Sequence, residues 1–487
     1  MKILLINPPR FQKVETTIPT FINEKRGELP PLGLLYLATS IKTKTDHDVK
    51  ILDCSLSGMT YEGIKKEILN YQADVVGISI ITFVLIDSLK VAEVAKNCEK
   101  ILNKKITVIA GGPHVIIYPE ETAGQKNIDF ALSGEAEFSI IDFLNYKDNI
   151  DRLKEIPGIY FTNGKHNIVK GPQFQYIEDL DSIPMPDRRL LEYEKYSSIL
   201  SNEGLLTTMM TSRGCPFQCI FCERLGKKFR AHSAEYVLKE IEDCLGLGIK
   251  EIFFHDDTFA VSKKRVMEIC KRITEKKLKF IFDLRSHINT IDDELLTALK
   301  AAGCKRISYG IESGVERIMK RIKKGISLKK AYRTVNLTKK HKIMTLTDFM
   351  IGHPDETIDD IYQSVDFAKK LNADFAQFTI TTLYPGTPLY YEAMEKKVID
   401  SDVWRRFATN PNLEFKPPRW DLTIDRNILV ELLHHCYKSF YLRPGYIGKQ
   451  LLKIRSLKEF NTKTTAGFSL LYNQVATKVG LKSNEIK

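Results

Sequence analysis

The most informative stretch of the sequence is one loop, which reads Thr211-Ser212-Arg213-Gly214-Cys215-Pro216-Phe217-Gln218-Cys219-Ile220-Phe221-Cys222. Its three cysteines have the spacing C-x3-C-x2-C and directly follow a strand predicted over residues 206–210. A loop with this spacing can wrap three thiolates around a small inorganic cluster, and thiolates are the preferred ligands of iron–sulfur clusters. Three ligands leave one iron of a four-iron cluster open, as catalytic metal sites do. The alternative is three buried cysteines, or a zinc site without its fourth ligand.

Strands and helices alternate from this loop onward. Apolar runs that favour strands lie at 206–210, 251–254, 280–284, 306–309, 344–350 and 376–381. Stretches that favour helices lie at 234–247, 263–276, 292–302, 328–340 and 358–371. This alternation predicts a partial (β/α)6 barrel of the TIM type, with its site at the carboxyl ends of the strands.

The first 145 residues show a similar alternation. Strands are predicted at 2–6, 49–52, 75–81, 106–110 and 129–132, and helices at 34–42, 61–70, 85–102 and 136–145. Short, continuously apolar strands predict a doubly wound, Rossmann-like parallel sheet, in an α/β protein. Ligands of such sheets lie beyond the carboxyl ends of the strands. Small residues such as Gly111-Gly112 at those ends let a ligand approach the backbone closely.

The other segments are less regular. A small hairpin is predicted near 158–164 and a helix over 428–440. Lys and Arg exceed Asp and Glu by 73 − 61 = 12, and residues 438–487 hold ten basic residues against two acidic ones. Such an excess indicates an anionic partner or a solvated tail. The expected organisation is a first domain, a linker with a hairpin, a barrel and a basic, mostly helical C-terminal region, at 1–145, 146–200, 201–400 and 401–487.

The sequence also bears on location. No apolar run reaches the roughly 18–20 residues of a membrane-spanning helix, and residues 1–9 are too short an apolar stretch for a signal peptide. Nine cysteines among 487 residues do not suggest a disulfide framework. A reducing, cytoplasmic location is therefore expected. Six cysteines outside the loop are interpreted as free and structural: Cys54, Cys98, Cys244, Cys270, Cys304 and Cys436.

The cysteine loop resembles the signature of the radical S-adenosylmethionine (radical SAM) superfamily. The resemblance implies that Cys215, Cys219 and Cys222 ligate a 4Fe–4S cluster whose open iron chelates S-adenosylmethionine (SAM). Reductive cleavage of SAM then gives a 5′-deoxyadenosyl radical. Phe221 matches the aromatic residue that contacts the adenine in this family. Further similarities lie at Gly310-Ile311-Glu312-Ser313-Gly314, Gly352-His353-Pro354 and Tyr384-Pro385-Gly386.

Contacts to SAM are also expected from acidic residues at the barrel strand ends. Many members of the superfamily have Gly-Gly-Glu after the second barrel strand, where this sequence has His255-Asp256-Asp257. Asp256 and Asp257 could still accept hydrogen bonds from the methionine ammonium group. Glu312 and Ser313 fit this role better, with strand-end capping as their alternative. Tyr309, with His255 and Asp256, is expected at the barrel mouth; no general acid or base is assigned.

The N-terminal domain resembles the cobalamin-binding domain of the cobalamin-dependent (class B methyltransferase-like) branch of this superfamily. The Asp-x-His-x-x-Gly signature of proteins that ligate cobalt through histidine is absent. Cobalamin is therefore expected without a protein histidine on cobalt, and His114 is expected as a turn residue near the nucleotide tail. The expected cobalamin contacts are Pro8, Pro9, Ser79, Thr82, Gly111, Gly112, His114, Gly134 and Glu135.

The resemblance implies transfer of a methyl group from methylcobalamin to an unactivated carbon of a small-molecule or lipid substrate. The alternatives are a radical cyclisation, rearrangement or hydroxylation without methyl transfer, and a non-enzymatic cobalamin or redox sensor. A low-potential donor such as a flavodoxin or ferredoxin would supply electrons. Apolar stretches flanked by basic residues, at 442–447 and 468–479, could contact a membrane surface. Nucleic acid is disfavoured, because the RNA-modifying branch needs further clustered cysteines near the N-terminus.

Overall fold

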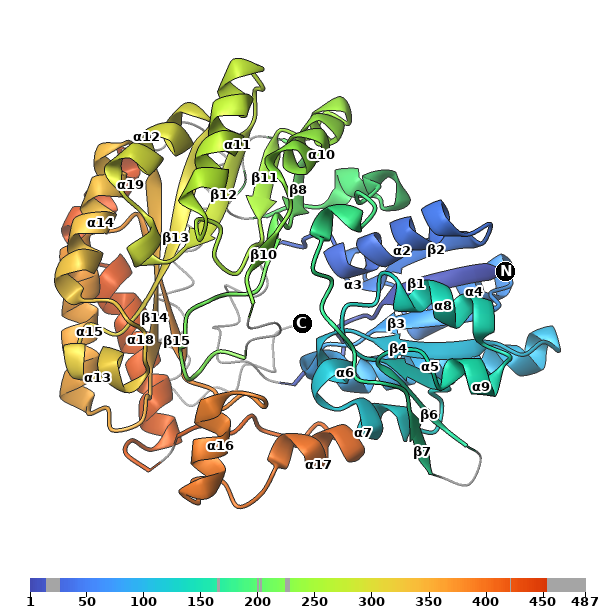
Figure 1. Cartoon of the computed structure of the whole chain (residues 1–487). Coiled ribbons are helices and arrows are strands. Elements are labelled where there is room, and N and C mark those ends of the chain that lie inside the picture. The colour runs from blue at the N-terminus through green and yellow to red at the C-terminus, as the bar shows by residue number, and fades with distance from the viewer. Residues whose placement is uncertain are drawn as a thin grey trace.

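The computed structural model describes residues 1–14, 27–163, 167–198, 201, 204–223, 228–420 and 422–452. Figure 1 shows two sheets that face each other across the centre of the molecule, each covered by helices. Helices α16 (Pro388–Glu395) and α17 (Val403–Thr409) join the two halves along one edge. Among the described residues, no helix combines the length and apolar character that crossing a membrane requires.

The first sheet has the strand order β2-β1-β3-β4-β5-β6-β7. Its first five strands are parallel, and the last two form an antiparallel hairpin, as predicted near 158–164. The strands are β1 (Lys2–Asn7), β2 (Asp48–Asp53), β3 (Val75–Ser79), β4 (Thr107–Gly111), β5 (Phe130–Leu132), β6 (Ile159–Thr162) and β7 (Ile168–Lys170). The helices are α2 (Leu32–Lys44), α3 (Cys54–Ser57), α4 (Tyr61–Tyr71), α5 (Leu85–Leu102), α6 (Pro113–Ile117), α7 (Pro119–Ala123), α8 (Ser139–Tyr146) and α9 (Ile150–Leu153).

Both faces of this sheet are buried, which explains its continuously apolar strands. Leu4 and Ile6 of β1 belong to the cluster that includes α4 and α5, whereas Ile3 and Leu5 belong to the cluster that includes α2 and α8. The doubly wound prediction is therefore confirmed, with the 2-1-3-4-5 order typical of flavodoxin-like folds. In that order the ligand crevice lies at the carboxyl ends of β1 and β3.

The second sheet is a partial barrel of six parallel strands, as predicted. Its order is β15-β14-β13-β12-β11-β8, and no pairing between β8 and β15 closes it in the described chain. The strands are β8 (Leu206–Met209), β11 (Glu251–Phe254), β12 (Ile281–Ser286), β13 (Cys304–Glu312), β14 (Met344–Ile351) and β15 (Phe375–Ile380). The surrounding helices are α10 (Ala234–Gly246), α11 (Lys263–Glu275), α12 (Asp293–Ala301), α13 (Glu316–Arg321), α14 (Leu328–Lys340) and α15 (Ile358–Leu371).

Side-chain alternation along the barrel strands separates the outer core from the lumen. On β13, Ile307, Tyr309 and Ile311 are buried in the apolar cluster that includes the surrounding helices. The Tyr309 hydroxyl lies 2.8 Å from Thr338 Oγ1 on α14. The expectation that Tyr309 lines the barrel mouth is therefore wrong, because it shares the face of Ile307 and Ile311.

The C-terminal part of the described chain packs on the barrel. Helix α18 (Arg426–Tyr441) lies against β15 and α15, and α19 (Pro444–Leu451) follows it. Tyr446, in the stretch 442–447, is buried and donates a hydrogen bond to the Asp374 carbonyl at 2.8 Å. This stretch therefore contacts the barrel through Tyr446, whereas 468–479 lies outside the described residues.

Candidate active site at the facing strand ends

The cysteine loop is held at its base by a short antiparallel pair. Strand β9 (Ser212–Arg213) pairs with β10 (Arg230–Ala231), and all three cysteines lie between them. Cys219 is buried, Cys215 is half-buried and Cys222 is exposed. Cys215 Sγ lies 3.5 Å from Thr258 Oγ1, and Cys222 N donates to the Cys219 carbonyl at 3.4 Å. The loop thus places the three thiols within one short segment at the barrel mouth.

Asp256 fixes the start of this loop. Its carboxylate accepts hydrogen bonds from Thr211 N and Thr211 Oγ1, both at 2.6 Å, and from Ser212 Oγ at 2.5 Å. Asp256 is 1% exposed. With these three donors, its carboxylate holds the strand that leads into Cys215.

Desolvation opposes ionisation of two of the three thiols, those of Cys219 and Cys222. Desolvation raises the pKa of Cys219 and raises that of Cys222 to about 12, with the neighbouring cysteines and acids adding to both shifts and Lys324 opposing them. Within the described ranges, no three His, Cys, Asp or Glu side chains converge closely enough to hold a metal ion. The fit to an iron–sulfur cluster comes instead from the donor set, because the loop supplies three soft sulfur ligands and the charge of a cluster would stabilise their thiolates.

Glu312 ends β13 in an unusual conformation. Its φ is +72°, and the register between β13 and β14 shifts between Gly310 and Glu312. A non-glycine residue at positive φ is uncommon and points to a functional constraint. The Glu312 carboxylate accepts a hydrogen bond from Lys324 Nζ at 2.9 Å, and both side chains are less than 10% exposed.

Gly310 makes room for this pair. A Cβ at Gly310 would lie 2.2 Å from Glu312 Oε1 and 2.8 Å from Lys324 Nζ. The Gly-x-Glu spacing in the resembling motif therefore has a steric basis. Lys324 was missed by the sequence analysis, since nothing in the sequence marks a lysine twelve residues beyond Glu312 as its partner.

The other expected SAM contacts differ in how far they are exposed. Ser313 Oγ is 3.2 Å from Ser364 Oγ on α15 and is fully buried, so this hydroxyl faces α15. Asp257 is exposed, and Phe221 is half-buried with its ring centroid 6.3 Å from that of His353. Asp257 and Phe221 therefore have the exposure that a ligand contact needs, and Ser313 and Asp256 are engaged within the protein.

The barrel lumen is charged, which the sequence analysis did not foresee. Asp348 on β14 is half-buried, and desolvation together with Glu312 raises its pKa to about 7, against the opposing charges of Arg285 and Lys324. Arg285 on β12 is exposed. Deeper along the strands, Arg306 pairs with Asp283 and Lys305 with Glu251. The lumen therefore offers both signs of charge to a ligand.

The expected cobalamin residues gather along the carboxyl edge of the first sheet. They follow β1 (Pro8, Pro9), end or follow β3 (Ser79, Thr82) and β4 (Gly111, Gly112, His114), and follow β5 (Gly134, Glu135). Gly112 has a φ of +102°, and a Cβ there would lie 2.9 Å from the Ile80 carbonyl oxygen. Glycine is therefore required at this turn.

His114 is fully buried at this edge. Its Nδ1 lies 3.0 Å from Thr82 Oγ1, and its Nε2 has no hydrogen-bond partner among the described residues. Burial lowers its pKa to about 4, so the ring is neutral at pH 7. An unpartnered, buried ring nitrogen is the kind of polar atom that a bound ligand or water satisfies.

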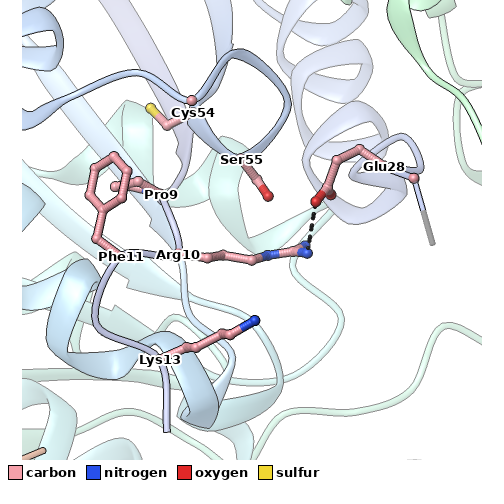
Figure 2. Close-up of a pocket in the computed structure, with 9 residues that line it drawn as sticks. Pro9, Arg10, Phe11, Lys13, Glu28, Cys54 and Ser55 are labelled. Atoms are coloured by element: carbon pink, nitrogen blue, oxygen red, sulfur yellow. Dashed lines mark hydrogen bonds and ion pairs between the residues drawn. The ribbon is translucent and has the colours of Figure 1, made fainter. Parts of the chain in front are cut away.

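A small cavity opens at the ends of β1 and β2. Its volume is about 230 Å³, and Figure 2 shows Arg10, Lys13, Glu28 and Ser55 around it, with Arg10 paired to Glu28 at 3.2 Å. Of the expected cobalamin contacts, Pro9 lines this cavity. The basic residues after β1 were missed by the sequence analysis, because only the prolines were taken as strand-end positions.

An ion-pair network joins the first sheet to the base of the cysteine loop. Glu135 binds Arg230 through both carboxylate oxygens, at 2.7 and 2.8 Å, and also accepts from Ile177 N. Arg213 pairs with Glu137 at 2.5 Å and with Glu135 at 3.3 Å. These arginines lie in β9 and β10, so the two halves meet at the strands that flank the cysteine loop. The Glu135 carboxylate is thus engaged in this network.

Comparisons with known proteins give the same two-part organisation. Residues 20–141 match the family model of the B12 binding domain, and residues 209–368 match that of the radical SAM superfamily. The chain is 37% identical over 461 residues to an uncharacterized methyltransferase of Pyrococcus horikoshii, covering 93% of this chain and 95% of the relative.

A more distant sequence relative and a solved structure match both halves of this chain. An anaerobic magnesium-protoporphyrin IX monomethyl ester cyclase of Rubrivivax gelatinosus is 25% identical, over 90% of this chain and 78% of the relative. The structure of the cobalamin-dependent SAM radical enzyme OxsB, with aqua-cobalamin and SAM bound, superposes with a TM-score of 0.72 at 17% identity. That match covers 96% of this chain and 71% of OxsB, and it supports the arrangement of the two sheets.

Proposed function

This chain belongs to the radical SAM superfamily, in the methyltransferase family that also carries a B12-binding domain, and on that premise we propose how its residues divide the work. Its cofactors are a 4Fe–4S cluster, SAM and cobalamin. Cys215, Cys219 and Cys222 ligate the cluster, and the strand ends of residues 1–145 hold cobalamin. Residues 146–200, whose hairpin β6–β7 extends the first sheet, lead to the barrel at 201–400, and 401–487 form the C-terminal region.

When bound, the cluster would supply an electron that cleaves one SAM to a 5′-deoxyadenosyl radical, and cobalamin, remethylated as cob(I)alamin by a second SAM with release of S-adenosylhomocysteine, would supply the methyl group. We propose that an unactivated carbon of a small-molecule or lipid substrate receives that methyl group. Methyl transfer is favoured over cyclisation because the 37% identical relative is named a methyltransferase. This chemistry does not need a side chain of the protein as a general acid or base.

The observation that carries the proposal is the double anchoring of the cysteine loop. Asp256 ties the start of the loop to the barrel, and Glu135 ties β10 to the first sheet through Arg230. Both anchors are buried or nearly so. A loop fixed to both halves keeps the cluster ligands at a set position relative to the strand ends of the first sheet, as a reaction that uses both cofactors requires.

Glu312 is the residue we assign to the amino group of SAM. Its carboxylate lies at the carboxyl end of β13 beside the cysteine loop, where Lys324 contributes to the electrostatics of both Glu312 and Cys219. Glu312 has a φ of +72° where the register of β13 shifts, and its carboxylate accepts a hydrogen bond from Lys324 Nζ. The hydrogen bond from Lys324 Nζ then holds this carboxylate in one orientation.

Substrate is expected in the lumen between the two sheets. Arg285 and Asp348 provide opposite charges there, which can orient a polar group of the substrate. Exposed apolar side chains beside the first sheet, Ile81 and Tyr384, provide a surface for the corrin or an apolar part of the substrate. Nine free cysteines and an oxygen-sensitive cluster favour a reducing compartment such as the cytoplasm.

The test is anaerobic reconstitution with iron, sulfide and hydroxocobalamin, followed by SAM and a strong reductant. Bound cobalamin, 5′-deoxyadenosine and S-adenosylhomocysteine are expected together. The variant with Cys215→Ala, Cys219→Ala and Cys222→Ala should bind no cluster and lose 5′-deoxyadenosine at least 100-fold, by loss of the thiolate ligands. Its matched control replaces buried cysteines outside the loop, Cys98→Ala, Cys270→Ala and Cys436→Ala, and should retain the cluster.

The same assay separates the alternatives. Deoxyadenosine without S-adenosylhomocysteine, in the presence of a converted substrate, would support a cyclase or rearrangement enzyme. Cobalamin binding without either product, under conditions in which the cluster is reduced and SAM is bound, would support a sensor. Equal iron content in the loop variant and the wild type would contradict the assignment of the three ligands.

A further inference from the structure

A groove of about 800 Å³ lies against the cysteine loop. The loop residues between the first two cysteines form one side, and the segment from α13 to the start of α14 forms the other. Phe217 stacks on His287 with ring centroids 3.6 Å apart, and Asn289 Nδ2 donates to the Gly325 carbonyl at 2.8 Å. These contacts fix both sides of the groove, so it is a formed feature of the fold.

The groove is positively charged. Lys320, Lys323 and Lys330 line it and are exposed, and no ion pair of theirs is found within the described ranges. The single acidic side chain in the lining, Glu316, accepts a hydrogen bond from Leu328 N at 2.8 Å. Three exposed lysines against one carboxylate create a local positive potential that favours an anionic partner.

The groove also has a short covalent path to the cluster ligands. Pro216 directly follows Cys215, and Gln218 directly precedes Cys219, so the groove wall is the backbone that carries two of the proposed ligands. Lys324 lines the groove as well, while its Nζ reaches inward to Glu312 at 2.9 Å. A molecule bound in this groove therefore contacts residues that directly adjoin two of the proposed cluster ligands in the sequence.

Reduction of the cluster needs an electron that the chain itself does not provide. A donor in this groove would reach the cluster through the loop, without entering the charged lumen that holds SAM and substrate. Redox encounters between proteins are small, weak and steered by charge, so a lysine-lined groove suits them. A larger hydrophobic interface is not required for such a transient contact.

We propose that this groove is the docking surface for a small acidic electron-transfer protein that reduces the cluster. The inference rests on the proposed function, because it requires a cluster held by the three cysteines. In each encounter the donor is oxidised by one electron and the cluster is reduced by one, and no covalent bond forms between the two proteins. The lysines steer and seat the partner and have no part in the chemistry of SAM.

The test measures binding of an acidic, FMN-loaded flavodoxin to the anaerobically reconstituted enzyme at low and at moderate salt. The charge-reversal variant Lys320→Glu, Lys323→Glu, Lys330→Glu should raise the Kd at least tenfold and flatten its salt dependence. The matched control reverses three exposed lysines on the first domain, Lys66→Glu, Lys100→Glu and Lys105→Glu. The control has the same net charge and should change the Kd less than threefold.

A second measurement separates docking from catalysis. With the chemical reductant dithionite, the groove variant should form 5′-deoxyadenosine at the wild-type rate, whereas with reduced flavodoxin its rate should fall at least tenfold. Loss of both activities with the cluster intact would overturn the docking proposal, since the lysines would then act on SAM chemistry. Equal weakening of flavodoxin binding in both charge-reversal variants would overturn it in favour of non-specific attraction. The proposal would also be overturned if the groove variant bound flavodoxin as the wild type does but no longer bound anionic lipid vesicles. That result would identify the groove as a membrane-binding surface.

Discussion

The two parallel sheets present their carboxyl ends to the same central space, yet the two edges are chemically different. The edge of the first sheet carries prolines, glycines and small polar residues, such as Ser79, Gly111 and Gly112, and the basic residues Arg10 and Lys13 lie to one side, at the ends of β1 and β2. The barrel edge and lumen carry charged groups, including Glu312, Lys324 and Asp348. Figure 1 shows that these unlike edges face each other.

The difference fits the two kinds of ligand. A large macrocycle is held by shape, by backbone groups and by apolar contact, so the first edge needs close approach more than charge. A small zwitterion such as SAM is oriented by charged hydrogen bonds, which are stronger in a partly buried site. Changes at the barrel edge should therefore remove SAM binding, and changes at the first edge should remove cobalamin binding.

The largest effect is expected at the barrel edge. Lys324→Met leaves the Glu312 carboxylate buried without its partner, and breaking a buried pair costs about 3–5 kcal/mol of unfolding free energy. The double variant Glu312→Gln, Lys324→Met removes both charges and should recover most of that stability. Neither variant should have wild-type SAM affinity, measured by equilibrium dialysis, because the single variant lacks the lysine that orients the Glu312 carboxylate and the double variant lacks the carboxylate itself. Wild-type SAM affinity in the double variant would contradict the assignment of Glu312.

An intermediate effect is expected at the edge of the first sheet. Gly112→Ala places a Cβ against the Ile80 carbonyl at a φ that side chains rarely adopt, which costs about 1–3 kcal/mol. The strained turn should release cobalamin on gel filtration while SAM binding to the cluster persists. The control Gly33→Ala lies in α2, where an added Cβ meets no atom within 4 Å. A parallel loss of SAM binding in Gly112→Ala would mean that the two edges are not separable.

The smallest effect is a pH dependence of the barrel rim. Glu356 follows β14, and its Oε2 accepts hydrogen bonds from Gly352 N and His353 N at 2.6 and 3.0 Å. Burial raises its pKa from 4.5 to about 8, with Asp360 adding to the shift and the two backbone donors and Arg317 opposing it. A raised pKa in the folded state stabilises the protein below pH 4.5, and this contribution is lost as pH rises through about 8.

Glu356→Gln should remove that dependence. Relative to the wild type, the variant should gain thermal stability between pH 7 and pH 9, by a few degrees in Tm, because the amide keeps an acceptor and carries no charge. Melting curves at pH 5, 7 and 9 measure this, with Glu155→Gln, at a surface ion pair, as the control. If the Tm of the wild type rose relative to the Tm of Glu356→Gln between pH 7 and pH 9, the raised pKa of Glu356 would be contradicted.

Much of the architecture could be predicted from the sequence. The strands of both sheets are short apolar runs separated by helices, and their order along the chain limits the possible sheets. The cysteine loop could be found because its signal lies within eight consecutive residues, from Cys215 to Cys222. The fold and the cofactors could therefore be predicted from local sequence patterns.

The side-chain partners could not be predicted, because they join distant segments. The Glu135 carboxylate binds Arg230, a partner 95 residues away that no local pattern marks, and its expected contact to cobalamin stays a prediction. The Glu312–Lys324 pair depends on a shift in strand register that no local pattern signals. The expectation that Tyr309 lines the barrel mouth was an avoidable error. Tyr309 alternates in phase with Ile307 and Ile311, and this local pattern places it in the core.

We expect the cysteine loop, which is anchored to both sheets, to hold the cluster close to cobalamin. Pulsed electron paramagnetic resonance on the reconstituted enzyme tests this, with the cluster reduced and the cobalt as Co(II). A clear dipolar coupling between the two centres is expected, and it should broaden or weaken in Arg213→Ala, which removes pairs to Glu135 and Glu137. Full occupancy of both centres with no coupling in the wild type would contradict the claim.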